Sequence, residues 1–214
     1  MRSPAGALFF LALLTSATLA QPHRPASPAG RSTIQVGGIH DARSGYVGGK
    51  WIEIRYGRPI KRRRDLFGPS DFAEFLNDGA EIWRAGANYS TQLDTEVEIE
   101  IAGTPVEPGE YTVFIHLERE TWTFVLSTWP AQSTYDYENK EALFGAYDYT
   151  DDRDVLRTEM TLEETPYSHE QLSWQFLDVD EKGGKLALFW DTKLAWVPFT
   201  LPIPRTIPGD PPPE

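Results

Sequence analysis

The chain has 214 residues, a formal net charge of −12 and no cysteine. The acidic balance argues against binding to nucleic acid or docking on anionic lipid, because both partners require a surplus of Lys and Arg. The lack of cysteine excludes disulfides, thiol catalysis and cysteine-based zinc sites, so stability must come from a core, which 7 Trp, 9 Tyr and 11 Phe can supply.

The first 20 residues have the organisation of an export signal. Arg2 precedes the apolar run AGALFFLALL, and Thr-Leu-Ala before Gln21 is a small-x-small cleavage site. A run of ten is too short to span a bilayer, which takes about 20 apolar residues. We therefore expect cleavage near Ala20 and a periplasmic or secreted protein without a membrane span.

Composition divides the rest of the chain into three parts. Residues 21–31 are rich in Pro, Ala and Ser, which is typical of a flexible leader. Residues 202–214 hold six prolines, which cannot donate to a sheet ladder, so we expect a disordered tail. A single β domain is predicted between them, over residues 32–201.

Apolar residues mostly alternate within this domain, which is typical of strands with one buried face. The alternating segments are, in chain order, 51–56, 95–103, 105–117, 121–129, 154–162, 170–180 and 185–201. The sequence Asp-Glu-Lys-Gly-Gly-Lys over 180–185 predicts a hairpin turn. Short helices are expected within 69–82, with Ser70 as N-cap, and within 136–147. The pattern predicts an all-β fold, an antiparallel β-sandwich or barrel-like domain with one or two short helices.

Six motifs occur in a fixed order along the domain: YGRP (56–59), RRRDLFG (62–68), WRAGAN..T (83–91), PGEYTVFI (108–115), TWTFVLS (121–127) and FGAYDYT..RDVLR (144–157). Together they resemble the bacterial secreted family called domain of unknown function 2911. The resemblance implies a periplasmic or secreted all-β domain and no particular reaction. Where that family usually has Lys-Gly-Arg, this chain has three arginines, so Arg63 would take the positive φ of the glycine. The segment between Gly68 and Trp83 is longer than in compact members.

Candidate ligand-binding residues gather around these motifs. Pro59 ends a strand sharply, which leaves Tyr56 and Arg58 at its end. Trp83 and Arg84 should point to opposite faces of a strand, so one can be core and the other site. The candidate ligand-binding residues are Tyr56, Arg58, Arg64, Trp83, Arg84, Asn88, Thr91 and His116.

Structural roles are open for the same side chains. Arg58 could bond carbonyls of its own turn, and Arg84 could meet a buried carboxylate of this protein. The basic run Lys61–Arg64 is either a receiver for an anionic ligand or an exposed turn neutralised by nearby acids.

Metal and catalytic motifs are sparse. Asp148, Asp151, Asp152 and Asp154 are a candidate calcium site, because hard carboxylate oxygens at short spacing suit that ion, although the EF-hand glycine and terminal glutamate are missing. The alternative is a solvated loop. The histidines have no zinc-binding spacing, and no nucleophile elbow, phosphate loop or dinucleotide fingerprint occurs. No cofactor and no catalytic residue is predicted.

Three functions are therefore considered. The leading hypothesis is an exported, non-enzymatic binding module for a small polar or anionic ligand such as a carbohydrate. One alternative is a hydrolase that uses a carboxylate pair or a His–carboxylate pair. The other is a structural or protein-interaction domain. The position of Arg84, in an open cavity or against a carboxylate of this chain, discriminates among them, and the sequence does not predict the oligomeric state.

Overall fold

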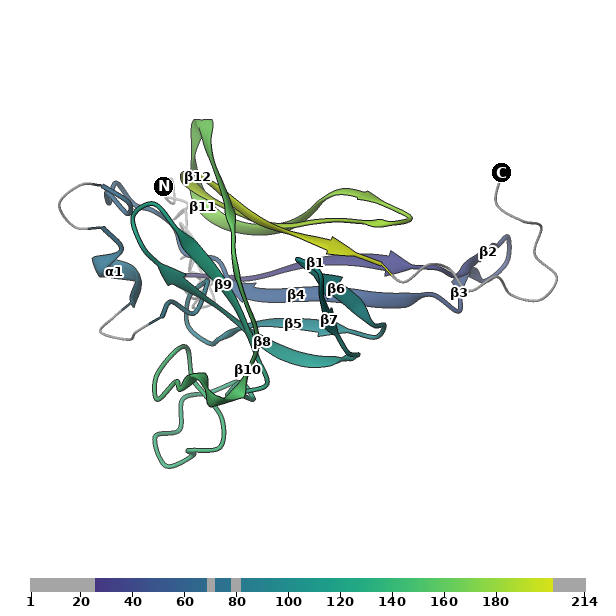
Figure 1. Cartoon of the computed structure of the whole chain (residues 1–214), viewed down its shortest axis with the longest axis horizontal. Coiled ribbons are helices and arrows are strands. Elements are labelled where there is room, and N and C mark those ends of the chain that lie inside the picture. Colours follow the sequence, from purple (N-terminus) through teal and green to yellow (C-terminus); the bar gives the residue numbers. More distant parts are fainter. Residues whose placement is uncertain (1–25, 69–71, 78–81, 202–214) are drawn as a thin grey trace, which may run out of the picture.

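Two antiparallel sheets pack face to face in a computed structural model that describes residues 26–68, 72–77 and 82–201 (Figure 1). The sheets are not closed into a barrel, so the sandwich alternative is the one confirmed. The predicted export signal, the Pro-rich tail and Ser70 lie outside the described residues. Among the helices in the described ranges, none has the length and apolar character needed to cross a membrane.

The larger sheet has six strands and the smaller has four. The six-stranded order is β1 (Ala29–Val36), β4 (Lys50–Gly57), β5 (Thr91–Thr95), β8 (Gly109–Leu117), β9 (Trp122–Ser127) and β10 (Asp154–Glu159). The four-stranded order is β11 (Thr161–Asp180), β12 (Gly183–Thr200), β6 (Ile99–Ile101) and β7 (Thr104–Val106). A separate hairpin joins β2 (Ile39–Asp41) and β3 (Gly45–Val47), and the short helices are α1 (Glu74–Asn77) and the 3-10 helix η1 (Asp151–Arg153).

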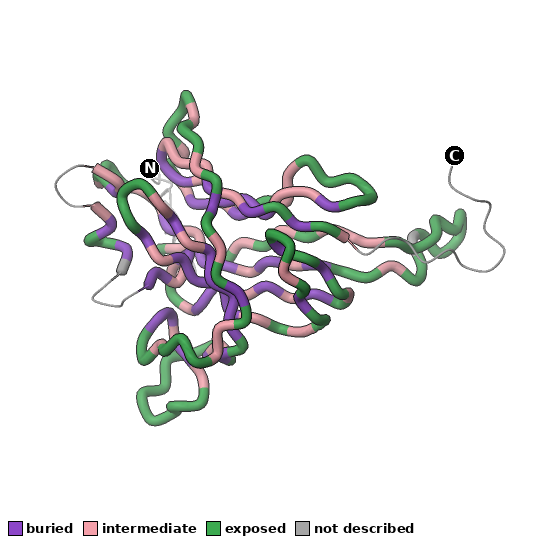
Figure 2. The backbone as a smooth tube through the Cα atoms, viewed as in Figure 1, coloured by how far each residue is buried: buried purple, intermediate pink, exposed green. Residues whose placement is uncertain are grey.

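The predicted alternation matches burial on the strands that line the core. On β4, Ile52 and Ile54 are fully buried while Glu53, between them, is partly exposed. On β6, Ile99 and Ile101 are buried and Glu100 is exposed. Buried residues gather where the sheets face each other, and exposed residues gather at the hairpin ends (Figure 2). Removal of these apolar side chains from water is the main stabilising contribution to the fold.

A second apolar cluster covers the outer face of the six-stranded sheet. Phe114 and Val125 belong to it, whereas their chain neighbours Ile115 and Phe124 face the main core. The segment 128–150 folds over this outer face and contributes Trp129 to it. Strands β8 and β9 are therefore buried on both faces at this point, which a simple alternating pattern does not predict.

Two local predictions are corrected. The helix expected within 136–147 is absent, and the segment forms turns, because the Gln132 side chain bonds its backbone: Nε2 donates to the carbonyls of residues 136, 139 and 142. Strand β1 begins at Ala29, inside the leader predicted over 21–31. Backbone pairing of Ala29 with Gly57 does not require an apolar pattern, so composition missed it.

The predicted hairpin at 180–185 is confirmed. Asp180 pairs with Gly183 at the ends of β11 and β12. Its carboxylate accepts hydrogen bonds from the backbone N–H groups of Lys182 (2.7 Å) and Gly183 (3.2 Å), which is how an aspartate stabilises a tight turn.

Candidate functional site

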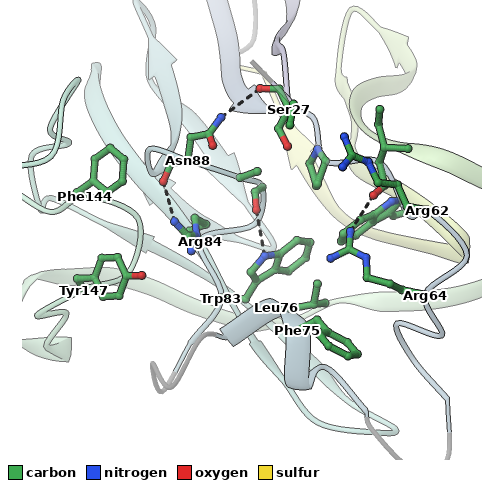
Figure 3. A pocket seen from close by; sticks show the side chains of 16 residues that line it. Ser27, Arg62, Arg64, Phe75, Leu76, Trp83, Arg84, Asn88, Phe144 and Tyr147 are labelled. Carbon is green, nitrogen blue, oxygen red and sulfur yellow. Dashed lines mark hydrogen bonds between the residues drawn. The ribbon is translucent and has the colours of Figure 1, made fainter. Parts of the chain in front are cut away.

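The site is a cavity of about 590 Å³ between the segment that follows β4 and the segment that precedes β5 (Figure 3). The residues that line it are Ala26, Ser27, Pro59, Ile60, Arg62, Arg64, Phe75, Leu76, Trp83, Arg84, Gly86, Ala87, Asn88, Phe144, Tyr147 and Trp190. Three of these are arginines and five are aromatic. Within the described parts of the chain, no Asp, Glu or His contributes to the lining.

One wall is a loop that interrupts a strand. Trp83 exchanges two backbone hydrogen bonds of 2.9 Å with Ile115 of β8, and Thr91 then pairs with Val113 on the same strand. The chain therefore leaves the sheet after Trp83 and re-enters it at Thr91. Residues 84–90 project from the end of β5, which places them beside the cavity.

Buried hydroxyl and indole groups fix the shape of this loop. Thr91 Oγ1 donates to the carbonyl of Ala85 (3.1 Å), and Trp83 Nε1 donates to the carbonyl of Gly86 (3.2 Å). Trp174 Nε1, from β11, donates to the same Ala85 carbonyl (2.9 Å). A Cβ on Gly57 would collide with the loop backbone, so the sheet approaches the loop closely. The loop is rigid enough to hold a binding group in place.

Arg84 lies in the cavity wall, where a backbone carbonyl and an aromatic ring are its described neighbours. Its Nη1 donates to the carbonyl of Asn88 (2.8 Å), and its guanidinium carbon is 5.7 Å from the centre of the Tyr147 ring. No carboxylate of the described residues lies within 4.0 Å of it. Gly145, at φ +68, leaves the space that the guanidinium fills. The cavity interpretation of Arg84 is the one the geometry supports.

Trp83 forms part of both the core and the cavity. It is 1% exposed and stacks on Trp190 with ring centres 5.9 Å apart. Trp83 and Arg84 were expected to serve different faces, one core and the other site. Both line the same cavity, because the chain turns away from the sheet directly after Trp83.

The basic run divides into groups with different partners. Lys61 pairs with Asp191, which neutralises it. Arg64 donates from Nε to the carbonyl of Lys61 (2.8 Å) and from Nη2 to that of Ile60 (2.7 Å). Arg62 uses its backbone N–H to bond the Glu170 carboxylate (2.7 Å). The side chains of Arg62 and Arg64 line the cavity, and neither forms an ion pair with a carboxylate of the described residues.

The positive φ expected at Arg63 is present. Its φ is 63°, and Arg62 before it has a φ of 52°. Two successive non-glycine residues in this region cost backbone strain. The turn therefore holds the Arg62 and Arg64 side chains in place at some expense to stability.

Four predicted residues lie outside the cavity lining. Tyr56 is core and donates to the carbonyl of Trp174 (3.2 Å), and Thr91 is fully buried in the loop. Arg58 donates from Nε to the carbonyl of Leu172 at 3.4 Å, which is the structural role considered for it. His116 is half-buried on β8 opposite Thr123.

Sequence reasoning missed several lining residues. These are chiefly Arg62, Phe75, Leu76, Phe144, Tyr147 and Trp190. Arg62 was considered only as part of the basic run Lys61–Arg64, a possible receiver for an anionic ligand, and not as a candidate site residue. Trp190 lies on β12, about a hundred residues beyond Trp83, and only the pairing of the sheets brings the two together.

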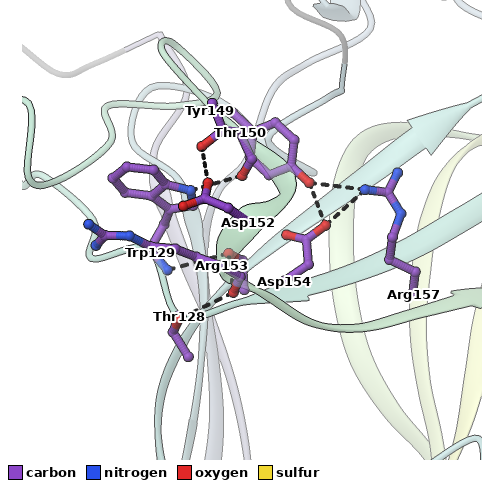
Figure 4. Close-up of polar contacts among 9 residues, drawn as sticks. Thr128, Trp129, Tyr149, Thr150, Asp152, Arg153, Asp154 and Arg157 are labelled. Carbon is purple, nitrogen blue, oxygen red and sulfur yellow. Dashed lines mark hydrogen bonds and ion pairs between the residues drawn. The ribbon is translucent and has the colours of Figure 1, made fainter.

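The four aspartates considered for calcium do not share a common site, and Figure 4 shows the polar contacts of two of them, Asp152 and Asp154. Asp148 pairs with Lys140 (2.6 Å), and Asp152 accepts from the Thr150 hydroxyl. Asp154 accepts from Tyr149 Oη and from Arg157, while Asp151 is exposed in η1. Over the described ranges, no group of three or more His, Asp or Glu is arranged to hold a metal ion.

Asp154 is the centre of a small polar network beside the outer apolar cluster. Its Oδ2 accepts from Tyr149 at 2.6 Å and from Arg157 at 2.8 Å. Burial, and then the hydrogen bond to this carboxylate, raise the pKa of Tyr149 well above its ordinary value. The tyrosine therefore stays protonated and acts as a fixed donor. Its ring packs on Phe114 with centres 5.0 Å apart, so the network fastens segment 149–157 to the sheet.

Comparison with known proteins gives one match. The family model described as "Protein of unknown function (DUF2911)" matches residues 40–199, which is more than half of the chain. No curated protein and no solved structure matches the chain.

Proposed function

The chain belongs to the DUF2911 family, whose description names no activity, and we propose that it is a non-enzymatic binding module for a small anionic molecule. The ligand site is the cavity beside Trp83. Sugar acids belong to the class of ligand proposed, as do carboxylates and phosphate esters.

The observation that carries the proposal is three arginine side chains that form no ion pair with a carboxylate of the described residues, in a protein of net charge −12. Four other arginines of the described residues do form ion pairs: Arg31 with Glu53, Arg55 with Glu53 and Asp94, Arg153 with Glu141 and Arg157 with Asp154. Acids are therefore abundant, yet none of the described ones lies at the cavity.

A guanidinium cannot release its proton in a protein, so these charges persist whether or not a ligand is bound. Arg64 and Arg84 are partly buried, whereas Arg62 is exposed. A partly buried charge without a counter-charge is costly, and low-dielectric walls focus its field into the cavity. A bound anion would offset the cost of the uncompensated charge, and the field would attract it into the cavity. Because an empty cavity leaves this charge uncompensated, the arrangement favours ligand binding over a purely structural role.

The size and walls of the cavity suit a small molecule. A volume of about 590 Å³ falls within the range of roughly 300–1,000 Å³ typical of ligand sites. Aromatic rings from Phe75 and Phe144 supply apolar contact area, the buried Trp83 and Trp190 form the back of the cavity, and the arginines supply orientation.

The hydrolase alternative requires a carboxylate or histidine at the site. None of the described lining residues supplies one. The geometry thus favours binding over hydrolysis. The interaction-domain alternative would be the conclusion if no small anion binds.

A thermal-shift series tests the proposal. Wild type would be melted with inorganic phosphate, succinate, glucuronate and terephthalate at constant ionic strength. A ligand at ten times its Kd stabilises by about 1.4 kcal/mol, which raises the Tm of a domain this size by about 3–6 °C. We expect at least one anion to do so.

The matched control is Arg31→Gln, which removes the same charge from a surface ion pair with Glu53. Stabilisation should persist in Arg31→Gln and disappear in Arg84→Gln. The proposal fails if none of the four anions raises the Tm of wild type, or if Arg84→Gln responds as wild type does.

Export rests on the sequence alone. We infer that the mature chain begins at Gln21, after the small-x-small site. Intact-mass measurement of the protein recovered from the periplasm or medium of a bacterial host should give the mass of residues 21–214. Retention of the first 20 residues would contradict the inference.

A further inference from the structure

We propose that the cavity takes a molecule with two anionic groups at opposite ends of an apolar or planar body. This inference rests on the proposed function and narrows its ligand class.

The cationic side chains lie in two groups, on opposite sides of the Trp83 indole (Figure 3). Arg84 comes from the loop before β5. Arg62 and Arg64 come from the turn after β4. They are on different segments of the chain, so their separation is fixed by the fold.

Hydrogen bonds to backbone hold each group in place. The Asn88 carbonyl fixes Arg84 through Nη1, and the carbonyls of Ile60 and Lys61 fix Arg64 through Nη2 and Nε. These bonds keep the Arg84 and Arg64 guanidiniums from converging on a single anion, whereas the Arg62 side chain makes no such bond within the described residues. They also orient donors before a ligand arrives, which lowers the entropic cost of binding.

Arg84 on one side of the cavity and Arg64 on the other both keep guanidinium N–H groups that can donate to a ligand. A guanidinium has five N–H groups, of which Arg64 uses two and Arg84 one in bonds to the described backbone. Carboxylates and phosphates match the spacing of the remaining pairs, and such bonds are stronger than neutral ones.

The lining between the two groups includes apolar side chains. Trp83 and Trp190 stack with an angle of 17° between their rings and form the buried back of the cavity, and Leu76 and Phe75 line the cavity beside them. A flat or aliphatic body would pack on Phe75, which is 57% exposed. A ligand with one anionic group would compensate one end and leave the other guanidinium partly desolvated and uncompensated.

Matched pairs of acids test the inference by calorimetric titration at pH 7 and constant ionic strength. Terephthalate is compared with benzoate, and adipate with hexanoate, so that each pair differs mainly by the second carboxylate. In wild type we expect one or both dianions to bind at least roughly tenfold more tightly than their monoanions, the lower end of what one charge-assisted hydrogen bond contributes.

Substitutions of single arginines show which residue binds the second carboxylate of the dianion. Arg84→Gln and Arg64→Gln should each bring the dianion to within about twofold of the monoanion, while Arg31→Gln keeps the wild-type ratio. Because Arg64 supports its own turn, Arg62→Gln is the second variant at that end if Arg64→Gln does not fold. Its side chain makes no hydrogen bond or ion pair within the described residues.

Two outcomes separate this inference from the proposed function. If each monoanion binds as tightly as its dianion, the two-ended ligand is wrong and the anion site stands. If none of the four acids binds, the two-ended ligand is wrong as well. In that case the thermal-shift series with phosphate and glucuronate decides the proposed function separately.

Discussion

Gly145 is the residue whose substitution tests the position of Arg84 most sharply. It has a φ of +68°, and an added Cβ would lie 2.7 Å from Arg84 Nη1 and 3.1 Å from its guanidinium carbon. Both contacts are with the far end of a flexible side chain. In Gly145→Ala the guanidinium would therefore swing away from its site, and the fold would remain.

Gly145→Ala should lower both the stability of the fold and the affinity for the ligand, by different amounts. An L-residue in the left-handed region costs about 1–2 kcal/mol, which lowers the Tm of a domain of this size by about 2–8 °C. Misplacing a charged hydrogen-bond donor costs about 1.5–3 kcal/mol of binding, so terephthalate affinity should fall by at least roughly tenfold.

Gly103→Ala is the control. Gly103 has a similar φ of +81°, but nothing lies within 4 Å of its added Cβ. Thermal melting and terephthalate titration would be run on both variants and wild type. We expect similar losses of Tm and a loss of affinity in Gly145→Ala alone. Wild-type affinity in Gly145→Ala would refute the placement of Arg84 as a ligand-binding group.

Three further outcomes follow from other parts of the molecule. Trp83→Phe should cost about 1 kcal/mol more than Trp190→Phe in urea unfolding, because the Trp83 indole N–H donates to a loop carbonyl while that of Trp190 is buried without an acceptor among the described residues. Tyr149→Phe removes a donor from the buried Asp154 carboxylate and should cost about 1–3 kcal/mol by the same assay. Burial and neighbouring carboxylates raise the pKa of Asp94, so the folded state binds its proton more readily than the unfolded chain. Its charge thus destabilises the fold at neutral pH, and this loss is relieved as pH falls through the raised pKa. Asp94→Asn should therefore raise the Tm at pH 7, with a gain that vanishes below the ordinary aspartate pKa of 3.8.

The sandwich could be predicted because its strands are amphipathic. Alternation at Ile52 and Ile54 specifies a buried face without knowledge of the partner strand, and Asp180 with the glycines after it specifies a turn. These signals are local. Local patterns do not say which strands pair, so the sequence left the sandwich and the barrel as alternatives.

The candidate site could be predicted only in part, for the same reason. Arg84, Asn88 and Arg64 were identified by residue type in short motifs, and they do line the cavity. Tyr56 and Thr91 come from the same motifs but turn into the core, because a strand alternates between two faces and the sequence does not say which one adjoins a cavity.

Trp190 lies outside the six motifs, and Tyr147 lies within FGAYDYT..RDVLR (144–157), but nothing local ties either residue to the rest of the site. Trp190 and Tyr147 reach the cavity through sheet packing and through the fold of segment 128–150 over the outer face. Even the separation of Arg84 from the described acidic residues depends on tertiary structure, since the sequence around it contains acidic residues.

A crystal structure of the protein grown with terephthalate tests the central claim most directly. We predict electron density for the ligand in the cavity, with one carboxylate within hydrogen-bond distance of the Arg84 guanidinium. An empty cavity in crystals that hold terephthalate elsewhere on the protein would contradict the claim that this cavity is an anion-binding site.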